Sequence, residues 1–226
     1  MARAKGRSAL LAGASGLVGR ELLAQMLQPD AGYRAIHLLL RRPLPGLARD
    51  PRLFVHDAID FAALPALPAV DEVFIALGTT IKAAGSQAAF RAVDFDAVVA
   101  TARAARAAGA KRIAVVSALG ADARSAVFYN RVKGEMQDAV AALGYETVCF
   151  AQPSLLVGDR EALGQPTRPG EAWATRLLRP VMALVPAGVR PIAAGTVARA
   201  LLRAMADARP GVHRLSSARL QQLGRV

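Results

Sequence analysis

The sequence predicts an α/β fold built on a doubly wound parallel sheet. Short, continuous apolar segments alternate with longer segments of helical spacing along most of the 226 residues. Such apolar segments are typical of strands covered on both faces, and their alternation with helices implies right-handed crossovers between parallel strands. Because 54% of the residues are hydrophobic, the chain can bury a sizeable core, and we expect a single domain over 1–226.

Each expected element before residue 153 follows from its local pattern. Strands are predicted at 8–12, 35–40, 53–56, 72–77, 112–117 and 146–151, where the apolar segments lie. Helical spacing predicts helices over 17–28, 86–108 and 129–143. Pro29 ends the first of these helices, Gly109 is the expected C-cap of the second, and Gly144 follows the third.

The pattern changes after Pro153. Glycine, proline and charged residues predict a loop over 158–170, and a short helix is expected at 173–178. Prolines break the region 180–191, a helix is predicted over 195–208, and a last short strand over 212–215. We expect 153–226 to form a small C-terminal subdomain on the substrate side of the sheet.

Bulk properties narrow the class of protein. The formal net charge is +12, but the arginines are scattered and no long basic run occurs, which disfavours nucleic-acid binding and suits a phosphate-bearing cofactor. No apolar run reaches the roughly 18–20 residues that cross a bilayer. Gly13 interrupts the first apolar segment, which argues against a signal peptide, and the lone Cys149 permits no intrachain disulfide. These features together predict a cytoplasmic location.

Three glycines with the spacing Gly13-x-x-Gly16-x-x-Gly19 follow the first predicted strand and open the first predicted helix. The first allows a sharp turn, the second lets the backbone approach a pyrophosphate, and the third lets the helix pack on the strand. N–H groups at the helix start and the helix dipole attract phosphates. In this setting the pattern predicts a dinucleotide-binding Rossmann domain. The expected contacts are Gly13, Ser15, Gly16, Leu17, Val18 and Gly19.

The end of the second predicted strand favours NADP over NAD. Arg41 and Arg42 stand where an NAD-binding protein usually carries an acidic residue, and a guanidinium suits the 2′-phosphate. The alternative is a pair of solvated surface arginines. Asp57 could accept from the adenine amino group or be a solvated loop carboxylate. Strand ends at the same sheet edge also bring Leu77, Gly78, Thr79 and Thr80 toward the cofactor's ribose and phosphates.

Tyr129 and Lys133 are spaced to share one face of a predicted helix. The Lys133 ammonium would favour the phenolate of Tyr129, which could then exchange a proton with a substrate oxygen. Lys133 could also hold the nicotinamide ribose. Ser117 ends the fifth predicted strand and could hydrogen-bond the same substrate oxygen. The alternative is an ordinary pair on a helix surface.

At these residues the chain resembles the short-chain dehydrogenase/reductase superfamily, in particular its atypical branch of Tat-interacting, oxidoreductase-like proteins and bacterial relatives. The matching stretches are Gly13-Ala14-Ser15-Gly16-Leu17-Val18-Gly19, Leu77-Gly78-Thr79-Thr80, Val116-Ser117-Ala118-Leu119-Gly120-Ala121-Asp122 and Tyr129-Asn130-Arg131-Val132-Lys133-Gly134-Glu135. The resemblance implies an NADP-type cofactor and a triad of Ser117, Tyr129 and Lys133. It also implies that Pro153, Ser154 and Leu155 touch the nicotinamide end. Members of the branch often have two serines where this chain has Ser117-Ala118, and Arg-Pro-Gly where it has Gln152-Pro153-Ser154. The substrate pocket of this chain is therefore expected to differ from theirs.

We therefore expect an NADP-dependent oxidoreductase acting on a small carbonyl or alcohol. Two alternatives stay open: a non-enzymatic, redox-responsive regulator that binds NADP(H), and an isomerase or dehydratase with a tightly bound cofactor. No metal site is predicted, because His37, His56 and His213 lack ligand spacing. Trp173 is expected to anchor the small subdomain. Asp94 and Asp96, inside the predicted helix 86–108, are expected to be solvated or locally bonded. The substrate and oligomeric state stay open.

Overall fold

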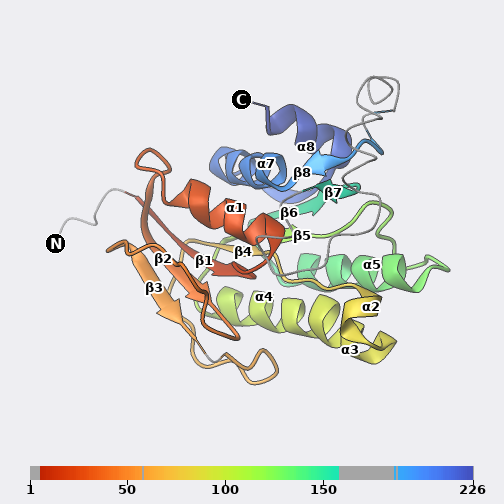
Figure 1. The fold of residues 1–226 in the computed structure, drawn as a ribbon, viewed down its shortest axis with the longest axis horizontal. Coiled ribbons are helices and arrows are strands. Elements are labelled where there is room, and N and C mark those ends of the chain that lie inside the picture. Colours follow the sequence, from red (N-terminus) through yellow and green to blue (C-terminus); the bar gives the residue numbers. More distant parts are fainter. Residues whose placement is uncertain (1–5, 58, 158–185, 187, 226) are drawn as a thin grey trace.

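A seven-stranded parallel sheet forms the centre of the molecule (Figure 1). The computed structural model describes residues 6–57, 59–157, 186 and 188–225. The strand order is β3-β2-β1-β4-β5-β6-β9, and every neighbouring pair is parallel. The strands are β1 (Arg7–Ala12), β2 (Tyr33–Leu39), β3 (Leu53–His56), β4 (Glu72–Ile75), β5 (Arg112–Val116), β6 (Thr147–Gln152) and β9 (Gly211–Ser216). The predicted doubly wound fold is confirmed.

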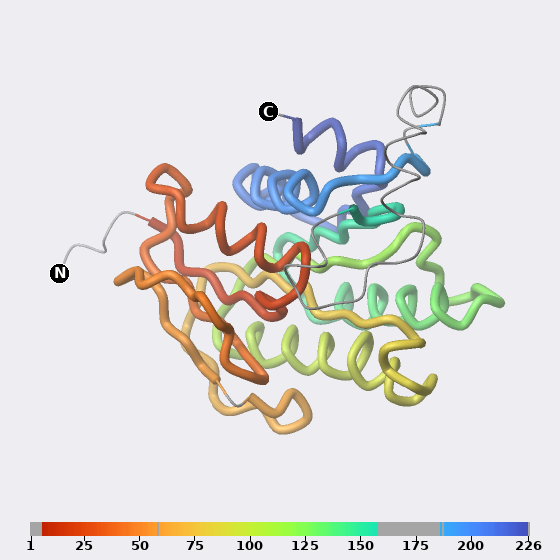
Figure 2. Tube along the Cα trace, viewed as in Figure 1, coloured from red at the N-terminus to blue at the C-terminus, as the bar shows by residue number. Residues whose placement is uncertain are grey.

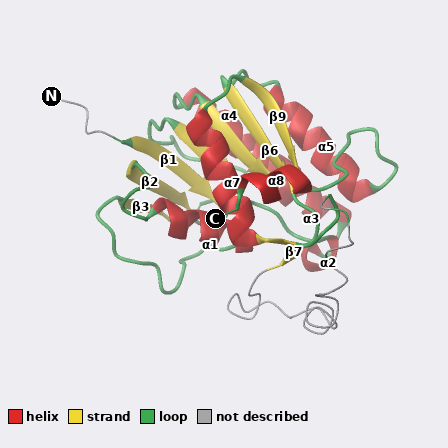
Figure 3. Cartoon of the chain, turned by 90° about the horizontal axis from the view of Figure 1, so that it is seen from above, coloured by secondary structure: helices red, strands yellow, loops and turns green. Residues whose placement is uncertain are grey.

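Helices cover both faces of the sheet. On one face lie α1 (Leu17–Met26), α7 (Ala194–Asp207) and α8 (Ser217–Leu223), and on the other lie α4 (Val98–Ala107) and α5 (Phe128–Ala141) (Figures 1 and 3). Helices α1 and α7 come from opposite ends of the sequence yet pack side by side (Figure 2). Across the described ranges, no helix has the length and apolar character needed to span a membrane.

Apolar side chains from the two helix layers make two cores, one on each face. Leu22 of α1 and Leu201 of α7 belong to the first, and Val98 of α4 and Met136 of α5 to the second. The central strands lie between these cores, which explains their continuous apolar sequence: every residue of β4 is buried. The C-terminal elements α7 and β9 are integral to these layers.

The structure refines several expected boundaries. The predicted helix 86–108 is divided into α3 (Gln87–Arg91), a π-helical segment η1 (Ala92–Ala97) and α4. Three further elements had no clear sequence signal: helix α2 (Ile81–Ala84) and the paired strands β7 (Leu156–Val157) and β8 (Ile192–Ala193). Helix α8 was also not predicted. The loop expected at 158–170 and the helix expected at 173–178 fall outside the described residues.

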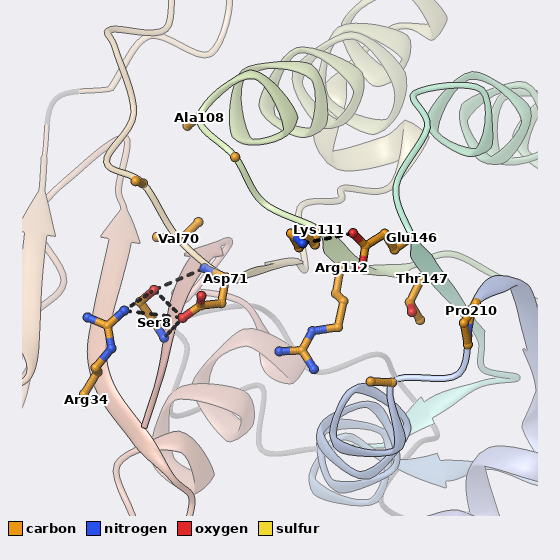
Figure 4. Close-up of a pocket in the computed structure, with 13 residues that line it drawn as sticks. Ser8, Arg34, Val70, Asp71, Ala108, Lys111, Arg112, Glu146, Thr147 and Pro210 are labelled. Atoms are coloured by element: carbon orange, nitrogen blue, oxygen red, sulfur yellow. Dashed lines mark hydrogen bonds and ion pairs between the residues drawn. The ribbon is translucent and has the colours of Figure 1, made fainter. Parts of the chain in front are cut away.

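A network of charged residues lies at the edge where the strands begin. Glu72 of β4 is fully buried, accepts a 2.6 Å hydrogen bond from the Tyr33 hydroxyl, and pairs with Arg7 at 3.4 Å and Arg112 at 3.3 Å. Beside it is a cavity of about 550 Å³, whose lining includes Arg112 (Figure 4). The lining cations shown there have acidic partners, so this edge has the character of a structural network.

Candidate functional site

The predicted site residues gather at the opposite edge, where the strands end. Strand β1 pairs with β2 on one side and with β4 on the other, so the chain winds outward in both directions from the β1–β4 pair. In open α/β sheets this switch point leaves a crevice beyond the carboxyl ends of the strands, and ligands bind there. The glycine turn follows β1 and the segment containing Gly78 follows β4, so both lie where such a crevice is expected.

The three glycines of the turn are required for different reasons. Gly13 has φ +93°, and a Cβ there would lie 2.5 Å from the carbonyl group of Ala76. A Cβ on Gly19 would lie 1.9 Å from the carbonyl oxygen of Gly13, so α1 packs on the turn without room for a methyl group. A Cβ on Gly16 would approach no described atom more closely than 3.4 Å, an ordinary contact. Protein packing therefore accounts for Gly13 and Gly19 but does not require Gly16.

The start of α1 is chemically suited to an anion. Gly16 is its N-cap, no side chain caps the helix, and its first turn contains no acidic residue. The first backbone N–H groups of a helix have no intrahelical acceptor, and the helix dipole makes this end positive. The exposed Ser15 stands beside these groups. The missing side chain at Gly16 and the donor set of Leu17 and Val18 thus fit the pyrophosphate of a dinucleotide.

Arg41 and Arg42 follow β2 and are exposed. Leu40, just before them, is buried and held on both sides, because its N–H bonds to the carbonyl of His56 and its carbonyl accepts from the N–H of Ile59. These two bonds bring the segment containing the exposed Asp57 alongside the arginines. Two exposed arginines and one exposed aspartate therefore follow the carboxyl ends of the neighbouring strands β2 and β3.

The segment after β4 lies directly on a buried ion pair. Nζ of Lys133 is 2.8 Å from Oδ1 of Asp94, and the N–H of Thr79 donates to Oδ2 of Asp94 at 2.9 Å. The two charged side chains are only 4% and 1% exposed. A Cβ on Gly78 would stand 3.3 Å from Asp94 Oδ1 and 3.7 Å from Lys133 Nζ, so glycine permits this close approach.

Tyr129, Lys133 and Gln137 follow one another at four-residue intervals along α5 and so share a face. The Tyr129 ring is half-buried, 5.3 Å from the ring of Phe90. The loop after β5 presses on the same helix, since a Cβ on Gly134 would lie 2.0 Å from the backbone nitrogen of Ala123. Helix α5, which carries the predicted tyrosine and lysine, is thus packed against Phe90 of α3 at Tyr129 and against the loop after β5 at Gly134.

Ser117 is buried, and its described side-chain partner is Gln137. The Gln137 amide donates from Nε2 to Oγ of Ser117 at 2.7 Å. Its Oε1 accepts from Arg214 Nε at 3.1 Å and from Gln152 Nε2 at 3.4 Å, which assigns the amide orientation. Since Gln137 occupies a lone pair of the Ser117 hydroxyl, the hydroxyl proton is left to donate elsewhere.

Three other residues predicted to contact the cofactor, Thr80, Pro153 and Ser154, make hydrogen bonds within the protein. The Thr80 hydroxyl caps α2 by accepting from the N–H of Ala83, so the cap uses its acceptor. Pro153 is buried, and its carbonyl accepts from the N–H of Leu119. Ser154 Oγ bonds to the carbonyl of Arg190 and lies 2.9 Å from Oγ of Ser217. The side chain of Leu155, next along the chain, is exposed. The contacts of Ser154 fasten the end of β6 to the C-terminal region.

Two site residues were missed by sequence reasoning. The expectation that Asp94 is solvated or locally bonded is wrong, because Asp94 is buried against Lys133 from another helix. The signal was present: Asp94 stands four residues after Phe90 and four before Val98, both fully buried, so it interrupts an apolar face. The second missed residue is Gln137, which is only 1% exposed. It lies one helical turn beyond Lys133, on the same face of the predicted helix, and that position was the available signal. The exposed Asp96 behaves as expected.

The remaining candidates make no metal centre within the described residues. Nδ1 of His37 and Nε2 of His56 come within 3.1 Å because β2 and β3 are neighbours, although sequence spacing gave no hint of a pair. No group of three or more potential metal ligands occurs in the part of the chain that the structure describes. Burial raises the pKa of Cys149 to about 11, so its thiol stays protonated near neutral pH.

The glycine turn, the sheet topology and the residues beyond β4 and β5 define an NAD(P)H-binding Rossmann protein. Residues 13–147 match the family described as NAD(P)H-binding, and the chain belongs to that family. It also belongs to the atypical short-chain dehydrogenase/reductase branch that the sequence resembles. The rat protein HTATIP2 is 34% identical over 174 residues, covering 75% of this chain and 69% of the relative.

Further comparisons agree on the fold and correct the expected location. A protein of Emericella nidulans named "Protein fmp52, mitochondrial" is 36% identical over 171 residues, covering 73% of this chain and 71% of the relative. The solved structure of the Bordetella bronchiseptica enzyme WbmF in complex with NAD+ superimposes with a TM-score of 0.67 at 16% identity, covering 96% of this chain and 77% of that one. The cytoplasmic location predicted above is wrong, since relatives of this kind are named as mitochondrial. That prediction rested on missing features, which do not distinguish compartments.

Proposed function

We propose that this protein is an NADP-dependent oxidoreductase that acts on a small carbonyl or alcohol. The observation that carries the proposal is the position of Lys133, one helical turn from Tyr129 and directly beneath the backbone after β4. That backbone ends a strand beside the β1–β4 switch point, where the nicotinamide half of a dinucleotide is expected. The bound coenzyme would supply or accept the hydride.

The chain's own residues would bind the cofactor in three places. Backbone N–H groups at the start of α1 hold the pyrophosphate, with the space left by Gly16. The exposed guanidinium groups of Arg41 and Arg42 pair with the 2′-phosphate and so select NADP over NAD. The exposed Asp57 would accept from the adenine amino group.

Proton transfer is assigned to the α5 face. Tyr129 gives a proton to the substrate oxygen, or takes one from it, and the Lys133 ammonium one turn away favours the phenolate state between turnovers. Lys133 also donates to the nicotinamide ribose. The free hydroxyl proton of Ser117, left available by the bond from Gln137, would polarise the substrate oxygen.

The test is NADPH oxidation by the purified protein against a panel of small aldehydes and ketones, with Tyr129→Phe as the variant. The variant should bind NADPH as tightly as wild type, while its turnover falls about 10²- to 10⁴-fold from loss of the acid/base group. If wild type binds NADPH but oxidises it with no member of the panel, the protein is a regulator. Nicotinamide coenzyme that copurifies and resists dialysis, without net oxidation, would indicate an isomerase or dehydratase.

A further inference from the structure

The π-helical segment η1 places one carboxylate inside the protein and leaves a neighbouring one outside. Within η1, Asp94 is 1% exposed and Asp96 is exposed. Short π-helical segments are rare and are found frequently at functional sites. Burying a carboxylate is unfavourable unless it is paired and hydrogen-bonded. The burial of Asp94 therefore has to be offset by its contacts with Lys133 and Thr79.

Asp94 joins three separate elements at the carboxyl edge of the sheet. One oxygen pairs with Lys133 of α5 at 2.8 Å, and the other accepts the N–H of Thr79, in the segment after β4, at 2.9 Å. Both contacts involve residues that the proposed function places at the cofactor. No other acidic side chain is paired with Lys133 among the ion pairs of the described residues.

Lysine needs such a partner to act from a buried position. Its ammonium is a compact, strongly hydrated charge on a flexible stem with several rotamers. With a side chain only 4% exposed, Lys133 has exchanged most of its water for protein, and burying the ammonium there without a partner would be unfavourable. Asp94 supplies the missing charge and fixes the direction in which the stem extends.

We propose that Asp94 is the positioning residue of this site: it holds the Lys133 ammonium beneath the Gly78–Thr79 backbone and locks that backbone onto the same carboxylate. This inference rests on the proposed function for the role of Lys133 at the ribose. In this role Asp94 would act through Lys133 and Thr79, and not by its own contact with cofactor or substrate. A purely structural role would involve the same ion pair with Lys133 and the same hydrogen bond from Thr79, so the two roles are separated by experiment.

The first experiment needs no cofactor. The apo protein is treated with an amine-acylating reagent, and labelling of Lys133 is followed by peptide mass spectrometry. Wild-type Lys133 should be protected, and Asp94→Asn should label several-fold faster, because the substitution keeps the size and an acceptor for Thr79 but removes the charge. Asp96→Asn, on the same segment, should label like wild type. Equal labelling of wild type and Asp94→Asn would overturn the proposal.

The second experiment is a double-mutant cycle read by NADPH affinity. Asp94→Asn should weaken binding about tenfold when Lys133 is present, the effect of one charge-assisted hydrogen bond. In the Lys133→Gln background the same change should alter affinity by less than about twofold, because Asp94 acts through Lys133. Additive losses would show that Asp94 supports the fold generally and would overturn the positioning role.

Failure of the proposed function looks different from failure of this inference. If wild-type protein binds no NADP(H), the proposed function falls, while the labelling experiment still reports whether Asp94 holds Lys133. If wild type binds NADPH and Asp94→Asn binds equally well in a folded protein, only the positioning role is lost. Thermal unfolding of each variant establishes that the protein compared is folded.

Discussion

A Cβ on Gly19 would lie 1.9 Å from the carbonyl oxygen of Gly13, closer than any real contact between such atoms. The methyl group of Gly19→Ala would therefore push α1 away from the turn, and we expect a loss of about 3 kcal/mol in unfolding free energy. Urea unfolding followed by circular dichroism measures this loss. A variant of wild-type stability would show that the turn is looser than described.

Gly16→Ala should separate binding from folding. A Cβ at Gly16 makes only an ordinary 3.4 Å contact, and its φ of −85° suits alanine, so stability should change by less than about 1 kcal/mol. The methyl group would nevertheless stand where the pyrophosphate approaches, and NADPH affinity should fall about 10- to 100-fold through lost charge-assisted hydrogen bonds. Calorimetric titration checks this, and undiminished affinity would place the phosphates elsewhere.

Replacing Arg41 and Arg42 together by alanine should reduce selectivity for NADP. We expect NADPH affinity to fall about 10- to 100-fold, the value of one lost charged hydrogen bond, with little change in NADH affinity. Arg209→Ala removes one positive charge from an exposed position before β9, at the other edge of the sheet, and serves as the control for a general charge effect. Equal loss of affinity for both coenzymes would indicate a general electrostatic effect and no recognition of the 2′-phosphate.

The pair of His37 and His56 should make stability depend on pH. Burial, then the neighbouring His56 and Arg34, lower the pKa of His37 below 6.5, so the folded state disfavours the imidazolium. Below about pH 6.5 the unfolded state binds more protons, and stability therefore falls as the pH falls. Protonation would break the hydrogen bond between His37 and His56. That loss of about 1 kcal/mol corresponds to a decrease of roughly 2–4 °C in Tm.

Thermal scans from pH 8 to about pH 5 test this histidine pair. His37→Gln should flatten the decrease in Tm on acidification, whereas His213→Gln, on β9, should leave the decrease as in wild type. A slope that His37→Gln does not alter would assign the pH dependence to other groups.

The Tyr33–Glu72 bond at the other edge of the sheet should contribute to stability without affecting the site. Burial beside Glu72 raises the pKa of Tyr33 well above its usual value, so the phenol stays a donor. Tyr33→Phe leaves the buried carboxylate short of one donor and should cost about 1–3 kcal/mol. NADPH affinity measured below the transition should be unchanged, and a large change in affinity would show coupling between the two edges.

Local sequence patterns determined the strands, the main helices and the glycine turn, because each depends on residues close together in the chain. The apolar segments predicted all six strands of the sheet that lie before residue 153, and a seventh strand was predicted at 212–215. The spacing of Tyr129 and Lys133 placed both on one face of a helix. The order of the strands and the membership of β9 depend on pairing between distant segments.

The tertiary structure alone decided which polar side chains meet. The sequence put Asp94 and Lys133 on different helices, and Ser117 and Gln137 on different elements, without saying that they touch. Likewise, strand register brought His37 to His56. The physical reason is that backbone propensity and apolar periodicity act over a few residues, whereas a buried ion pair forms only where the packing of separate elements removes water from both partners.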